Sequence, residues 1–80
     1  MRKFIGEHRK VYLVFSKNIS MGNAVLLANK SFKTSFRNLY VTEATVIDDK
    51  LYFPQTKGNY PKGDKESVWA VFTKGGRTND

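Results

Sequence analysis

Residues 10–28 read KVYLVFSKNISMGNAVLLA, and within them the spacing of apolar side chains changes from that of a strand to that of a helix. Residues 11–15 are all β-branched, aliphatic or aromatic, so both faces of a strand built from them are apolar. A strand over residues 10–17 is therefore expected at the centre of a sheet, where both of its faces are covered.

A helix is expected directly after this strand, over residues 20–30. Its apolar residues recur at the i, i+3, i+4 and i+7 spacing of one buried face: Met21, Ala24, Val25 and Ala28. Asn18 or Ser20 can cap the first turn, because a short polar side chain accepts hydrogen bonds from the N–H groups that a helix start leaves without partners. Residues 30–37 are rich in Ser and Thr, which disfavour a helix interior, and an extended segment or loop is expected there.

The next two strands are expected to form a hairpin. Residues 39–47 and 50–53 are β-prone, and Asp48 and Asp49 between them suit a tight two-residue turn. Pro54 cannot donate a backbone hydrogen bond, so the pairing should stop there.

The remainder of the chain completes a single small domain. Residues 54–66 form a polar loop with two Pro and two Gly, and residues 67–73 read as the last strand. The order is strand, helix, strand, strand, strand. It predicts an α+β fold, a mostly antiparallel four-stranded sheet with one helix packed on a face. The domain is expected to span residues 1–74, and residues 75–80 to form a flexible C-terminal tail.

Charge is distributed unevenly along the 80 residues, whose formal net charge is +7. Residues 1–42 carry eight cationic side chains and one acidic side chain, whereas residues 43–80 carry six of each. The whole positive excess therefore lies in the first half. Such an asymmetry favours a polyanionic partner, since a surface that is basic only for solubility mixes its signs more evenly.

No catalytic or metal-binding motif is evident, so we expect no enzyme, no metal and no cofactor. The chain has no Cys and a single His, which leaves few ligands for zinc. Glu43, Asp48 and Asp49 could hold Mg²⁺ in a nuclease, but two adjacent Asp residues are also common turn formers. A metal-independent ribonuclease could draw on a second group, Glu7, His8, Arg9 and Lys10, whose members alternate between the two faces of a strand.

Cationic side chains are interleaved with aromatic ones, and this pattern suits nucleic acid. One group comprises Phe32, Lys33, Phe36, Arg37 and Tyr40, and another comprises Lys57, Tyr60, Lys62 and Lys65. Cations hold phosphates and aromatic rings stack on unpaired bases, so DNA or RNA, above all single-stranded, is the first candidate partner. The competing interpretation makes Phe32 and Phe36 core residues. The nucleic-acid-binding residues predicted from the sequence are Arg9, Lys10, Lys30, Lys33, Arg37, Lys57, Tyr60 and Lys62.

The alternative function is a small phage-type or regulatory protein that binds and inhibits an acidic host protein. Its contact surface would be a sheet edge or the polar loop, anchored by Tyr60. The longest apolar run is too short to span a bilayer, and the N-terminal residues lack the apolar region of a secretory signal. We therefore expect a cytoplasmic protein that does not bind membranes.

Overall fold

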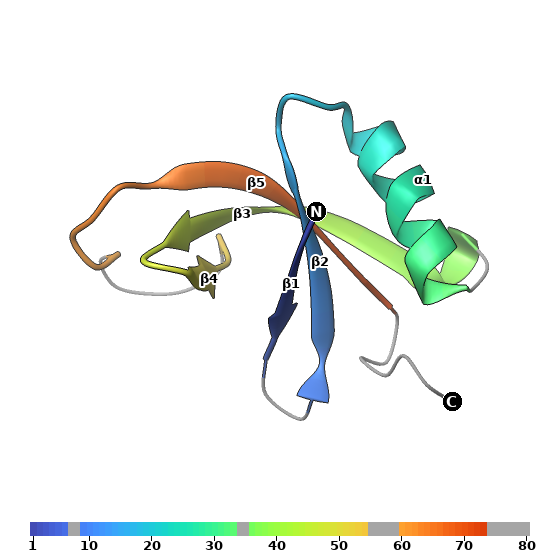
Figure 1. Ribbon diagram of the computed structural model, residues 1–80, viewed down its shortest axis with the longest axis horizontal. Coiled ribbons are helices and arrows are strands. Elements are labelled where there is room, and N and C mark those ends of the chain that lie inside the picture. Colours follow the sequence, from blue (N-terminus) through green and yellow to red (C-terminus); the bar gives the residue numbers. More distant parts are fainter. Residues whose placement is uncertain (7–8, 34–35, 55–59, 74–80) are drawn as a thin grey trace.

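One α-helix and a five-stranded antiparallel sheet make up the part of the chain that the computed structural model describes, residues 1–6, 9–33, 36–54 and 60–73 (Figure 1). The elements in chain order are β1 (Arg2–Ile5), β2 (Val11–Ser16), α1 (Met21–Phe32), the 3₁₀-helix η2 (Phe36–Asn38), β3 (Leu39–Ile47), β4 (Lys50–Tyr52) and β5 (Glu66–Thr73). The strands lie side by side in the order β1-β2-β5-β3-β4.

The α+β class and the single helix are confirmed, but the predicted strand number was too low. The additional strand is β1, which pairs with β2 in a hairpin closed by a 2.7 Å hydrogen bond from the Gly6 N–H to the Lys10 carbonyl. Two of its four residues, Arg2 and Lys3, are charged. The segment therefore lacks an apolar strand pattern of its own, and pairing with the strongly β-prone β2 makes it extended.

The last strand, β5, lies in the middle of the sheet. It pairs antiparallel with both β2 and β3, so these two strands run parallel to each other, and α1 connects them. The helix packs on β5 and β3. The Trp69 indole on β5 donates a 3.0 Å hydrogen bond to the Ile19 carbonyl, which attaches the connection before α1 to the sheet. The predicted central position of β2 is confirmed, since β1 and β5 flank it.

A first apolar core fills the space between the helix and the sheet. Its buried members are Leu13, Phe15, Ala24, Ala28, Phe32 and Val71. Two of them are alanines on the inner face of α1, and their small side chains let the helix approach the strands closely. Val11, Val41 and Trp69 are half-buried around this cluster, and Val25, which was expected on the buried face of the helix, is also half-buried.

The opposite face of the sheet forms a second core because the sheet curls into a half-barrel. In Figure 1, β1 and β2 run down the view while β3 and β5 run across it, as expected for strongly twisted neighbours. The buried members of this concave core are Val14, Ala44, Val46, Val68 and Ala70, with Phe4, Leu51 and Phe53 packed around them. Within the described part of the chain, both faces of the central strands are thus buried with a single α-helix.

Residues 30–32 are helical, so the prediction of an extended segment or loop there was wrong. The helix continues to Phe32, which is buried in the first core, and this burial offsets the weak helix preference of Ser31. It ends at Lys33, which adopts the left-handed conformation at φ 55° and donates its N–H to the Asn29 carbonyl at 2.9 Å. Thr34 and Ser35 lie outside the described residues.

The hairpin between β3 and β4 follows the prediction closely. β3 occupies residues 39–47 as expected, and β4 ends at Tyr52, before Pro54. Asp48 and Asp49 have φ values of 50° and 63°. Positive φ at both central residues is the geometry of the two-residue turn that matches the twist of paired strands, and aspartate tolerates it better than most residues.

Loss of the α1 cap provides a first test of the fold. The Ser20 hydroxyl accepts a 3.1 Å hydrogen bond from the Asn23 N–H, so Ser20→Ala should lower the free energy of unfolding by about 1 kcal/mol. Ser20→Asp is the matched control, because aspartate caps equally well and adds a favourable negative charge at the helix start. Urea unfolding of both variants makes the comparison. Equal stability of Ser20→Ala and the unaltered chain would contradict the cap.

Candidate functional site

Four aromatic rings form a continuous row on the face of the sheet opposite α1. The ring of Tyr12 lies 5.0 Å from that of Phe53 and 5.3 Å from that of Phe72, measured between centroids, and the ring of Phe72 lies 5.5 Å from that of Tyr40. We call Phe53, Tyr12, Phe72 and Tyr40 the aromatic row. Its interplanar angles of 50°, 63° and 69° are those of tilted and edge-to-face contacts, the geometry that aromatic pairs prefer.

Strand register places these rings side by side. Tyr12 on β2 and Tyr40 on β3 are both direct partners of Phe72 on β5. Alternation along each strand turns these three side chains away from the helix, while their neighbours Leu13 and Val71 point into the first core. Phe53 follows β4 and reaches Tyr12 across the concave face, because the curl of the sheet brings β4 towards β2.

The row begins where the concave core ends. The core is closed by fully buried Val and Ala side chains, whereas Tyr12, Phe72 and Phe53 are only half-buried. Tyr40 at the end of the row is 45% exposed. Part of the row's ring surface therefore faces solvent in the free protein.

Lys10 lies directly against this row. Its Nζ is 4.4 Å from the centroid of the Phe72 ring and 5.5 Å from that of Tyr12. A cation at this distance is attracted by the negative face of the ring. Arg9, the preceding residue, is exposed and has a φ of 61°. Two consecutive cationic residues therefore precede β2, and the second of them, Lys10, contacts the middle of the row.

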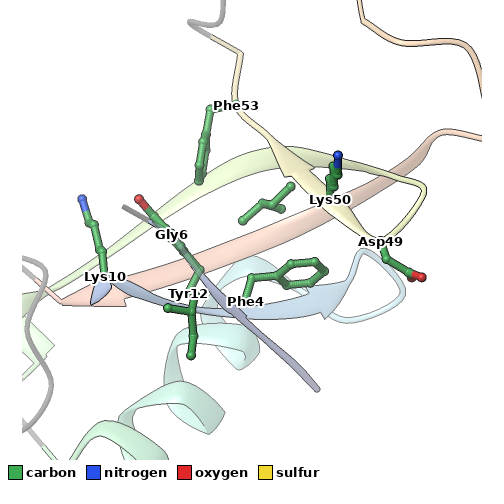
Figure 2. A pocket seen from close by; sticks show the side chains of 9 residues that line it. Phe4, Gly6, Lys10, Tyr12, Asp49, Lys50 and Phe53 are labelled. Atoms are coloured by element: carbon green, nitrogen blue, oxygen red, sulfur yellow. The ribbon is translucent and has the colours of Figure 1, made fainter. Parts of the chain in front are cut away.

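A groove of about 610 Å³ opens beside the row, between the two outer strands of the half-barrel (Figure 2). We call it the edge groove. It is lined by Phe4, Ile5, Gly6, Lys10 and Tyr12 from one side and by Asp49, Lys50, Leu51 and Phe53 from the other. Figure 2 shows Lys10 and Tyr12 on the β2 side and Phe53 and Lys50 on the β4 side. Because Lys10, Tyr12 and Phe53 border both features, the groove and the row form one continuous surface.

Gly6 shapes the wall of this groove. A Cβ at this position would lie 3.1 Å from Cε2 of Tyr12, a contact closer than most side chains allow. The ring of Tyr12 therefore packs against bare backbone. This close approach holds one member of the row in place from the β1 side.

The residues predicted to bind nucleic acid are distributed over several parts of the molecule. Lys30 and Lys33 lie at the C-terminal end of α1, on the helix side of the sheet, and Arg37 lies in η2. Lys62 is exposed in the segment before β5. Of the predicted set, Lys10 contacts the aromatic row, and Arg9 directly precedes Lys10 in the chain.

The aromatic residues considered as base contacts, Tyr60 and Phe32, also lie away from the aromatic row. The Tyr60 ring lies 5.9 Å from that of Tyr52, which points away from the concave face because it alternates with Leu51 along β4. Phe32 is a core residue, as the competing interpretation held. Lys57 falls outside the described residues, as do Glu7, His8 and the predicted tail.

None of the four members of the row was among the predicted binding residues, although Tyr40 was named in one of the groups of cationic and aromatic side chains. The available signal was an aromatic residue at a position that alternates with buried aliphatic residues, as Tyr12 does beside Leu13 and Phe72 beside Val71. That signal places each ring on a face of its own strand. It does not show that the three strands are neighbours, because the pairing joins segments about 30 to 60 residues apart.

The acidic residues considered for a metal site have other roles in the structure. Glu43 forms an ion pair with Lys17, and Asp48 and Asp49 form the β3–β4 turn. Within the described ranges, no three or more His, Asp or Glu side chains are grouped as metal ligands would be. None of the described helices has the length and apolar character needed to cross a membrane.

The aromatic row, Lys10 and the edge groove bring several ring faces, a cation and a cavity together on one surface. Comparison of the chain with family models, with curated proteins and with solved structures gives no match.

Proposed function

We propose that this chain binds single-stranded nucleic acid through the aromatic row, with bases stacked on its rings and phosphates held by neighbouring cations. The observation that carries the proposal is the contact of Lys10 with a row of partly exposed rings. Base stacking on aromatic side chains and cations along the backbone are the two elements that sequence-tolerant single-strand binding requires.

The arrangement favours unpaired over paired bases. In a duplex the bases stack on one another, so a ring lying on a sheet cannot reach their faces without unstacking them. A single strand can turn its bases towards Tyr40 and the rest of the row while its phosphates approach Arg9 and Lys10. The net charge of +7 strengthens this attraction over a longer range.

Core packing is the competing explanation for the row. It accounts for Phe53 and Tyr12, which are half-buried beside the concave core. It accounts less well for Tyr40, which extends the row outwards and remains 45% exposed. A ring in this position adds ligand-accessible surface without closing the core.

Titration with salt tests the proposal. Fluorescence anisotropy should show that a labelled oligothymidine of about 12 nucleotides, within the usual site sizes of small single-strand-binding folds, binds more tightly than a duplex of equal length. Each phosphate that is neutralised on a single strand adds about −0.7 to the slope of log K against log salt. If both Arg9 and Lys10 contact phosphates, the slope of log K against log salt should be about −1.4 or steeper.

Two variants that each remove one positive charge distinguish a phosphate contact near the row from a general effect of net charge. Arg9→Gln should make the salt slope shallower by about 0.7. Lys62→Gln, on the exposed segment before β5, should leave the slope unchanged. Absence of binding to any single strand at low salt, or tighter binding to the duplex, would refute the proposal.

A second candidate, binding to an acidic protein, is favoured by the sheet edges. Among the described strands, β1 and β4 each pair with one neighbour, and the edge groove lies between them. An extended acidic segment could add to either edge through main-chain hydrogen bonds, the mode by which a phage-type or regulatory inhibitor could act. Capture of a partner from a lysate in the presence of nuclease would support this function, whereas capture only without nuclease would support nucleic acid.

A further inference from the structure

The Lys10 ammonium lies where a base would have to stack. Its Nζ is 4.4 Å from the centroid of the Phe72 ring. The neighbouring rings, those of Tyr12 and Tyr40, flank Phe72 on its two sides along the row. Lys10 therefore covers part of the Phe72 ring between these two neighbours.

We propose that Lys10 is a displaceable cover: when a single strand binds, a base replaces the ammonium over Phe72, and the ammonium moves to the adjacent phosphate. This inference rests on the proposed function and assigns its ligand as an unpaired base carrying a phosphate. The side chain is suited to the movement, because four methylene groups and rotatable N–H donors allow it to swing without a backbone change.

The exchange is favourable because the contacts that form are stronger than the contact that is lost. A cation over a partly exposed ring is held weakly, whereas stacking of a base on an aromatic ring is a stronger contact. The displaced ammonium also gains a charge-assisted contact with phosphate. A ligand with only one of these groups does not compensate: free phosphate provides no base, and a duplex provides no accessible base face. Lys10 therefore acts as a specificity-determining residue.

Lys17 provides a matched control within the same molecule. Its Nζ also lies over an aromatic ring, at 4.6 Å from the centroid of Trp69. However, Lys17 is ion-paired with Glu43, and the Trp69 side chain packs against the first core on the helix side of the sheet. A ligand bound on the aromatic row should therefore leave the contact between Lys17 and Trp69 unchanged.

Nuclear magnetic resonance distinguishes the two lysines directly. In the free protein the ε-methylene protons of both Lys10 and Lys17 should be shifted upfield by the rings beneath them. Saturating oligothymidine should return the Lys10 signals towards those of an exposed lysine and leave the Lys17 signals shifted. Inorganic phosphate at the same charge concentration should move neither set.

A pair of variants tests the phosphate half of the exchange. Lys10→Gln should bind oligothymidine more weakly at low salt, with a slope of log K against log salt that is shallower by about 0.7, and should approach the unaltered protein at high salt. Lys17→Gln, which removes the same charge, should follow the unaltered protein throughout. Retained backbone spectra would show that both variants are folded.

The outcomes separate this inference from the function on which it rests. If oligothymidine binds while the Lys10 signals stay upfield, the displacement is wrong and single-strand binding stands. If the Lys10→Gln slope equals that of the unaltered protein, the phosphate contact is wrong. If no oligonucleotide binds at low salt, the proposed function and this inference both fail.

Discussion

Replacement of Leu13 by alanine should lower the free energy of unfolding by about 2–5 kcal/mol, the usual cost of a Leu-to-Ala change in a core. Leu13 lies on β2 with 4% of its surface exposed, among the side chains that join the sheet to α1. The expected total for an 80-residue domain is only about 4–12 kcal/mol, at the usual stability per residue. The variant should therefore unfold at a much lower urea concentration.

Leu26 supplies the matched control for this change. It carries the same side chain on α1 but is 52% exposed, so Leu26→Ala should change stability by less than about 0.5 kcal/mol. Chemical unfolding followed by tryptophan fluorescence reports on both variants, since Trp69 connects β5 to the start of the helix. Similar losses for the two substitutions would mean that the helix does not cover this face of the sheet.

Replacement of Tyr40 by alanine is expected to have the largest effect on the proposed function. Loss of one stacked base should cost about 1–3 kcal/mol, or roughly a 5- to 150-fold lower affinity for oligothymidine. The slope of log K against log salt should stay the same, because no phosphate contact is removed. With 45% of its surface exposed, Tyr40 contributes less to the core than the other rings, so the fold should survive.

Two further substitutions show whether the ring face at this position is responsible. Tyr40→Phe retains the face and should bind nearly as well as the unaltered chain. Tyr60→Ala removes a ring that packs against Tyr52, away from the row, and should have little effect on binding. A strong loss on Tyr60→Ala together with normal binding by Tyr40→Ala would move the binding surface to the segment before β5.

Local pattern was sufficient to predict most of the individual elements. The apolar run at residues 11–15 became a central strand, and the Asp48-Asp49 pair became the tight turn of a hairpin. The i, i+3, i+4, i+7 spacing located α1 to within about two residues at its C-terminal end. Each of these features depends on interactions between residues that are close in the chain, and such residues can be identified from the sequence.

Where prediction failed, distant contacts had decided the structure. β1 contains two charged residues in four and is extended because β2 pairs with it. Phe32 prolongs the helix because a buried site between α1 and the sheet accepts its ring. In both segments the free energy gained by pairing or burial outweighs the local preference of the chain.

The sequence by itself determined four of the five strands, most of the helix, the excess of positive charge and the presence of aromatic residues near cations. Only the tertiary structure decided which aromatic residues are neighbours. Tyr12, Tyr40 and Phe72 lie on three strands whose order in the sheet differs from their order in the chain. The chain adopts the strand order and register that bury both apolar faces of the sheet at once. The free energy of this burial has contributions from residues throughout the domain. The candidate site is a product of that arrangement.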